Sequence, residues 1–176
     1  MSKSLDKLRS VIQLDSELNK IQDVDVLLEN ILREARRVLN ADAGSIYIRD
    51  QEELAVSYAQ NDTMQASLPK GEKLIYNVFR IPIDTKTISG YAAHSGEPVN
   101  IPDVYAIPKS APYHFDPYYD QKSGYKTTSM LALPLKTNMG DILGVLQIIN
   151  GLEENGEVRV FDQDDELIVT HFASNA

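Results

Sequence analysis

Two apolar runs joined by a turn sequence constrain the fold of this chain most strongly. Residues 128–136 and 142–150 are rich in leucine, valine and isoleucine, and the stretch between them contains Asn-Met-Gly-Asp. This pattern predicts a β-hairpin, with residues 142–150 as a buried central strand. A second pair of strand-like runs, 45–50 and 54–60, is joined by a polar turn. The centre of the chain is therefore predicted to be an antiparallel sheet.

Helical patterns flank these strands. Residues 5–21 and 27–39 repeat apolar side chains at spacings of three and four, and residues 162–176 have the character of a closing helix. That spacing is the helical period. A short helix is predicted over residues 88–94, where Thr87 is a good N-cap.

These elements predict an α+β fold. Its central antiparallel sheet carries the terminal helices on one face, and the short helix plus a long loop cover a pocket on the other. The loop, residues 102–124, is rich in proline, tyrosine and aspartate. A loop that long inside a compact domain is usually functional. Residues 1–22 are predicted to be a linker or dimerisation helix, and residues 23–176 the globular domain.

The first helix leaves two interpretations open. Val11, Leu14, Leu18 and Ile21 follow a heptad-like rhythm, but for only about two heptads. The helix either lies on its own domain or forms the seam of a parallel homodimer, to which the last helix would contribute. The chain ends without a helix cap at residues 174–176. We therefore expect the last helix to continue in a longer parent protein.

Composition excludes several classes of function. The chain has no cysteine, so disulfides, thiolate catalysis and cysteine metal clusters are excluded. The net charge of −9 argues against a nucleic-acid or anionic membrane surface. No apolar run approaches the roughly 20 residues of a membrane-spanning helix. These features predict a cytoplasmic protein.

No sequence motif indicates catalysis or a metal site. The chain has no nucleophile elbow, no phosphate-binding loop and no dinucleotide glycine pattern. His94, His114 and His171 do not have the spacing of metal ligands. The acidic cluster at residues 162–166 begins a predicted helix, where the helix dipole favours carboxylates. We predict that the domain is not an enzyme and holds no metal.

Four segments together resemble the GAF domain family of small-molecule sensors. They are residues 41–47, 88–103, 124–131 and 144–150, and the resemblance extends over about residues 25 to 176. It implies a regulatory sensor domain of a larger bacterial signalling protein, whose output domain is a phosphohydrolase, cyclase or kinase in cis.

The resemblance is greatest to the cyclic-nucleotide-binding branch of that family. Its signature is Asn-Lys, a gap, then Phe, three residues and Asp-Glu. Here Asn150 is followed by Gly151 in place of the lysine, while Phe161 and Asp165-Glu166 are intact. In the family the lysine pairs with the aspartate that corresponds to Asp165. Arg159 is the candidate substitute.

The resemblance also implies a set of ligand-binding positions. The ligand would be cyclic AMP or cyclic GMP, with its phosphate on the amides at the start of the short helix. Ala59-Gln60 replaces an aromatic-acid pair of the family, so the base is expected to lose its stacking partner and to bind more weakly. The positions carried over are Ser45, Ile88, Ser89, Asp120, Ser123, Thr127 and Gln147.

The sequence leaves two other functions open. One is a ligandless GAF module that couples subunits by dimerisation, and the other is a haem sensor with His114 as axial ligand. A covalent bilin is excluded because there is no cysteine. An open cavity under residues 103–127 favours ligand binding, and a cavity filled by side chains favours the ligandless module.

Overall fold

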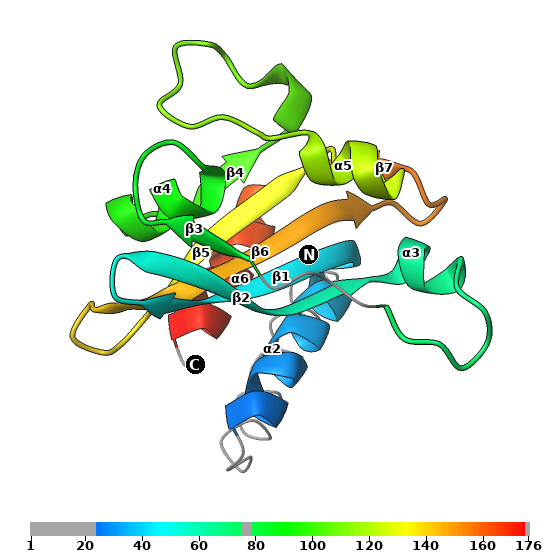
Figure 1. The fold of residues 1–176 in the computed structure, drawn as a ribbon, viewed down its shortest axis with the longest axis horizontal. Coiled ribbons are helices and arrows are strands. Elements are labelled where there is room, and N and C mark those ends of the chain that lie inside the picture. Colours follow the sequence, from blue (N-terminus) through cyan, green and yellow to red (C-terminus); the bar gives the residue numbers. More distant parts are fainter. Residues whose placement is uncertain (1–23, 75–78, 175–176) are drawn as a thin grey trace.

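The computed structural model describes residues 24–74 and 79–174 of the chain (Figure 1). The predicted helix over residues 5–21 lies outside these residues, as do the dimer seam assigned to it and the end of the chain. The elements in order are α2 (Val24–Leu39), β1 (Ala41–Asp50), β2 (Glu53–Asn61), α3 (Asp62–Ala66), β3 (Arg80–Pro82), α4 (Ile88–Ser95), β4 (Val99–Ile101), the 3₁₀ helix η1 (Val104–Ala106), α5 (Tyr118–Ser123), β5 (Met130–Lys136), β6 (Ile142–Leu152), β7 (Val158–Arg159) and α6 (Gln163–Ser174).

One antiparallel sheet organises these elements. Its strand order is β3-β2-β1-β6-β5-β4, and β7 pairs with β6. The predicted hairpin is formed by β5 and β6, and β6 lies between β1 and β5. The α+β fold class and the central position of the 142–150 strand are confirmed.

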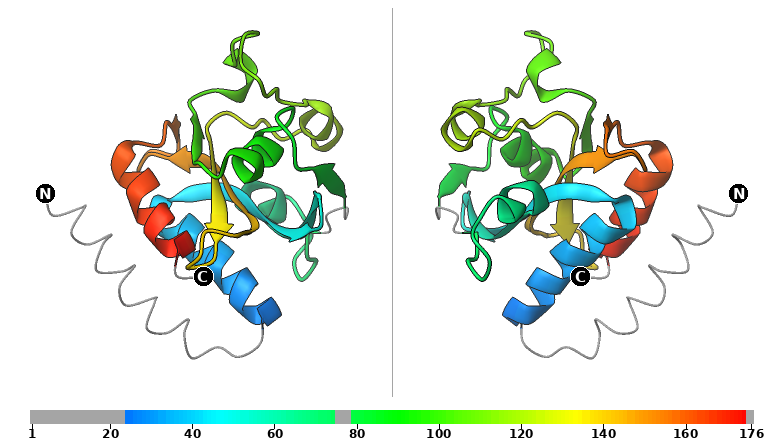
Figure 2. Two further views of the ribbon diagram at one scale, coloured as in Figure 1. Left: turned by 90° about the vertical axis from the view of Figure 1, so that its left-hand side faces the viewer. Right: turned by 90° about the vertical axis from the view of Figure 1, so that its right-hand side faces the viewer.

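Helices lie on opposite faces of the sheet (Figure 2). On one face, α2 packs mainly on β1 and α6 on β5, with Leu32, Leu146 and Val169 in the same buried cluster. On the other face, α4 and η1 pack through a second cluster that includes Val104 and Val145. Successive residues of β6 alternate between these faces, as expected for a strand. The closing helix and α2 therefore share one face, and the short helix and long loop cover the other, as predicted.

The first strand begins earlier than the sequence indicated. The strand was predicted to begin at residue 45, but Ala41 to Gly44 form the start of β1 and pair with β6. Asn40, with φ of 51°, ends α2. Small residues are needed because α2 lies close to the strand: a Cβ on Gly44 would lie 2.9 Å from a methyl carbon of Leu32.

The long loop contains structure that its composition did not predict. Within residues 102–124 lie η1 and α5, and β7 was also missed. The short strand β3, Arg80–Pro82, contains a proline and lies at the sheet edge, where proline is tolerated. In residues 24–74 and 79–174, every helix falls short of the length and apolar character that crossing a bilayer requires.

Candidate functional site

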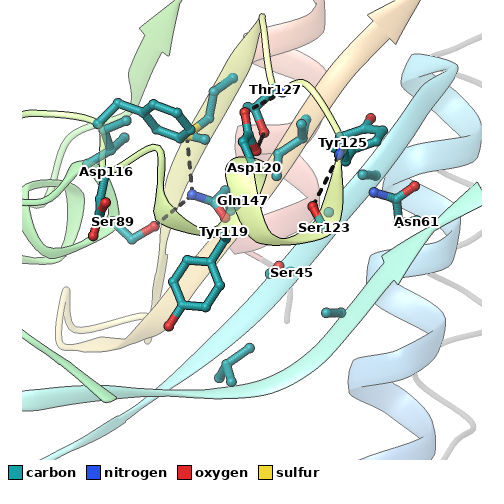
Figure 3. Close-up of a pocket in the computed structure, with 18 of the residues that line it drawn as sticks. Ser45, Asn61, Ser89, Asp116, Tyr119, Asp120, Ser123, Tyr125, Thr127 and Gln147 are labelled. Atoms are coloured by element: carbon teal, nitrogen blue, oxygen red, sulfur yellow. Dashed lines mark hydrogen bonds between the residues drawn. The ribbon is translucent and has the colours of Figure 1, made fainter. Parts of the chain in front are cut away.

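A cavity of about 510 Å³ lies between the sheet and the loop side of the domain (Figure 3). Its floor is formed by β1, β2, β5 and β6, and its cover by the start of α4, the loop after residue 113 and α5. This volume is in the range of small-molecule sites. All seven positions carried over from the family resemblance line it: Ser45, Ile88, Ser89, Asp120, Ser123, Thr127 and Gln147.

The floor of the cavity holds one buried amide, that of Gln147. It lies opposite Ser45 in the β1–β6 pairing. Its Nε2 donates to Ser89 Oγ at 3.3 Å and to Met130 Sδ at 3.2 Å, and its Oε1 accepts from the Tyr47 hydroxyl at 3.5 Å. Because a thioether sulfur only accepts hydrogen bonds, Met130 fixes the orientation of the amide.

Tyr47 stays protonated on this floor. Its burial raises the pKa of the hydroxyl well above the ordinary value, and Tyr119 adds to the shift. Tyr47 is therefore a neutral hydrogen-bond donor at any physiological pH. The result is a neutral floor that offers hydrogen bonds without a fixed charge.

The N-terminus of α4 forms a second polar group of the cavity. Thr87 is its N-cap, as predicted, and its Oγ1 accepts from the Gly90 amide at 3.0 Å. The first amides of a helix have no acceptor within the helix, and here they belong to Ile88 and Ser89. A Cβ at Gly90 would lie 2.5 Å from Thr87 Oγ1, so the cap requires glycine at that position. The start of α4 thus offers backbone amides to an anion.

Three further predicted site residues, Asp120, Ser123 and Thr127, lie on the α5 side of the cover. The Asp120 carboxylate, on α5, accepts from the Thr127 amide and hydroxyl, each at 2.8 Å, and from the Tyr105 hydroxyl at 2.6 Å. Ser123 Oγ accepts from the Tyr125 amide at 3.2 Å. Asp120 and Thr127 therefore bind each other, a contact that the family resemblance did not predict.

Aromatic rings line the cavity, although the sequence predicted that the base would lose its stacking partner at Ala59. Phe79 and Tyr119 are stacked, with ring centroids 5.0 Å apart and an interplanar angle of 25°. The Tyr47 ring meets Phe79 edge-on at 6.0 Å. Ala59 also lines the cavity, but its methyl group offers no ring for stacking. The stacked rings of Tyr119 and Phe79 thus come from α5 and from the segment before β3, and no local pattern in the sequence marked them.

The signature asparagine fixes the chain where it leaves the cover. Asn150 has a φ of 55°, and its Oδ1 accepts from the Thr128 amide at 2.7 Å. Its Nδ2 donates to the Tyr125 hydroxyl and to the Lys126 carbonyl, each at 2.9 Å. The Tyr125 hydroxyl in turn donates to Asp42 Oδ2 at 2.7 Å. Burial is the largest cause that raises the pKa of Tyr125, and this hydrogen bond to Asp42 raises it further.

Arg159 takes the place of the missing lysine, as predicted. Its Nη1 lies 2.5 Å from Asp165 Oδ2, and Asp165 is fully buried. The other guanidinium nitrogen donates to the Leu39 carbonyl at 2.6 Å, and Asp165 also accepts from the Asp162 amide at 2.9 Å. This ion pair joins β7, α6 and the end of α2 beneath the sheet.

The histidines are dispersed. His114 lines the cavity, while His94 and His171 lie in the last turns of α4 and α6. Among the residues that the structure describes, no group of three or more histidine, aspartate or glutamate side chains is placed to hold a metal ion.

The GAF domain model matches residues 23–176. The chain belongs to the GAF domain family. GAF domains are regulatory sensor domains.

Two curated relatives are phosphodiesterases. This GAF domain is 30% identical over 178 residues to the dual 3′,5′-cyclic-AMP and -GMP phosphodiesterase 11 of Drosophila melanogaster. It is 42% identical over 84 residues to phosphodiesterase 11A of Takifugu rubripes. The alignments cover 97% and 48% of this chain but only 11% and 8% of those proteins.

Solved structures share the fold. The GAF domain of a phosphoenolpyruvate-protein phosphotransferase from Coxiella burnetii has a TM-score of 0.68 at 20% identity, covering 97% of this chain and 92% of that one. The free methionine-R-sulfoxide reductase of Neisseria meningitidis has a TM-score of 0.70 at 21% identity, covering 97% and 86%. At this level of identity the likeness concerns the fold alone.

Proposed function

We propose that this GAF domain is a regulatory sensor that binds a cyclic purine nucleotide in the cavity and controls an output domain of a larger protein. The observation that supports this most is the cavity itself: about 510 Å³ of open space, lined by stacked rings, a buried amide and a helix N-terminus. These are the groups that a flat base, a ribose and a singly charged phosphate require.

Each part of the nucleotide has a matching region. The cyclic phosphate lies at the Ile88 and Ser89 amides, where the helix dipole favours an anion. The base lies against the ring of Tyr119, and Gln147 Oε1 and Ser45 take up its polar edge or the ribose. Lys122 also lines the cavity and offsets part of the charge of Asp116 and Asp120.

The expected affinity is micromolar. No arginine is among the lining residues of the described chain, so the phosphate is held by dipoles and neutral donors. A hydrogen bond of this kind contributes about 0.5–1.5 kcal/mol net, and a micromolar complex requires about 8 kcal/mol in all. The phosphodiesterase relatives, whose names specify cyclic AMP and cyclic GMP, support this class of ligand.

Isothermal titration calorimetry tests the proposal. The isolated domain is titrated with cyclic AMP and cyclic GMP, with linear AMP and GMP as matched controls that carry an additional phosphate charge. We expect saturable heat with at least one cyclic nucleotide at micromolar concentration, and weaker binding of the linear forms. Absence of heat with either cyclic nucleotide up to the millimolar range would instead favour the ligandless dimerisation module, whose association light scattering would detect.

A further inference from the structure

A tyrosine outside the cavity donates a hydrogen bond to the cover of the cavity. Tyr105 lies on η1 and is half-exposed, and it is not among the lining residues. Its hydroxyl nevertheless donates to Asp120 Oδ2 at 2.6 Å. That hydrogen bond raises the pKa of Tyr105 to about 12, so the donor proton is present throughout the physiological range.

The attachment matters because few contacts among the described residues hold α5. None of the residues of α5 is buried, and Gly124, with φ of 75°, ends the helix after six residues. Within residues 24–74 and 79–174, the stacking of Tyr119 on Phe79 and the Asp120 carboxylate fix the helix over the cavity. The carboxylate is shared, since Thr127 binds it from the β5 side and Tyr105 from the η1 side.

Tyr105 is itself fixed by the wall of the cavity. Its ring meets that of Phe115 edge-on, with centroids 5.2 Å apart, and Phe115 lines the cavity. Lys126 Nζ lies 5.9 Å from the centre of the Tyr105 ring. Loss of the hydroxyl would therefore leave the Asp120 carboxylate held from the Thr127 side alone, while the ring keeps its place.

We propose that Tyr105 is a positioning residue whose hydrogen bond to Asp120 acts as a latch: it keeps α5, and with it the Tyr119 ring, closed over the cavity and so sets how long a ligand stays bound. The position of α5 is a property of the protein alone, whereas the effect on how long a ligand stays bound rests on the proposed function.

The two statements are tested separately, beginning with the free protein. The variant is Tyr105→Phe, and the matched control is Tyr118→Phe, which removes a hydroxyl from an exposed tyrosine of α5 that does not line the cavity. Hydrogen exchange is measured at the amides of Gln121, Gly124 and Thr127, which donate to Pro117, to the Asp120 carbonyl and to the Asp120 carboxylate. We expect exchange about three- to tenfold faster in Tyr105→Phe only, from the loss of one hydrogen bond. Unchanged exchange at all three amides would overturn the latch.

The ligand step is measured by stopped flow. A fluorescent anthraniloyl derivative of cyclic AMP, or of cyclic GMP if calorimetry favours it, is chased from each protein by an excess of the unlabelled nucleotide. The expected result is a dissociation rate about three- to tenfold higher in Tyr105→Phe, with a smaller change in Kd because association also becomes faster. An unchanged dissociation rate would overturn the role in residence time. If no nucleotide binds but exchange is faster, the latch stands and the proposed function fails.

Discussion

Replacing Arg159 with alanine is expected to lower the free energy of unfolding by about 3–5 kcal/mol. Asp165 is fully buried, and Arg159, whose side chain is 15% exposed, is the cation paired with it. Removing the guanidinium takes the Arg159 cation away from a buried carboxylate and the Arg159 donor away from the Leu39 carbonyl. Urea denaturation monitored by circular dichroism measures the change.

The Arg159→Lys variant is the control for charge. A lysine retains the cation but cannot reach Asp165 and the Leu39 carbonyl with a rigid fork, so we expect a loss smaller than that of alanine. An Arg159→Ala variant within about 0.5 kcal/mol of the wild type, the range of ordinary surface substitutions, would contradict the structural role of the ion pair.

Replacing Tyr119 with alanine is expected to weaken cyclic nucleotide binding by about 5- to 150-fold. Stacking of a base on an aromatic side chain contributes about 1–3 kcal/mol, and each 1.4 kcal/mol is about tenfold in affinity. Tyr119 lines the cavity and stacks on Phe79. Calorimetry with the nucleotide that the wild type binds measures the change in Kd.

The neighbouring tyrosine provides a matched control. Tyr118 is on the same helix and is 53% exposed, but it does not line the cavity, so Tyr118→Ala should leave Kd within about twofold of the wild type. Tyr119→Phe keeps the ring and should retain most of the affinity. Equal losses in Tyr118→Ala and Tyr119→Ala would indicate a general effect on α5, and the stacking role would be wrong.

The framework of the fold follows from local patterns. The 142–150 strand is apolar on both faces because helices cover one side of it and α4 and the loop the other. Thr87 was recognised as a cap because its role depends only on the residues that follow it. Arg159 was identified because Gly151 stands where the family signature has a lysine that pairs with the aspartate. Asp165 therefore needed another cation, and Arg159 provides it.

The aromatic wall of the cavity and the latch were not predictable in the same way. Phe79 and Tyr119 are 40 positions apart in the sequence and meet only because α5 lies over the cavity. Tyr105 and Asp120 lie in one long loop whose composition carries no periodicity, so neither η1 nor α5 was expected. Contacts of this kind depend on tertiary placement, which outweighs local propensity in short elements.

Amide NMR of the isotopically labelled domain shows most directly whether the cavity binds a cyclic nucleotide. Titration with cyclic AMP or cyclic GMP reports whether binding occurs and where. We expect saturable shifts at the amides of Ser45, Ser89 and Thr127, which line the cavity. We expect no comparable shift at Leu167, which is exposed on α6 on the opposite face of the sheet. No shifts at millimolar nucleotide, or shifts confined to the α2 and α6 face, would contradict nucleotide binding in the cavity.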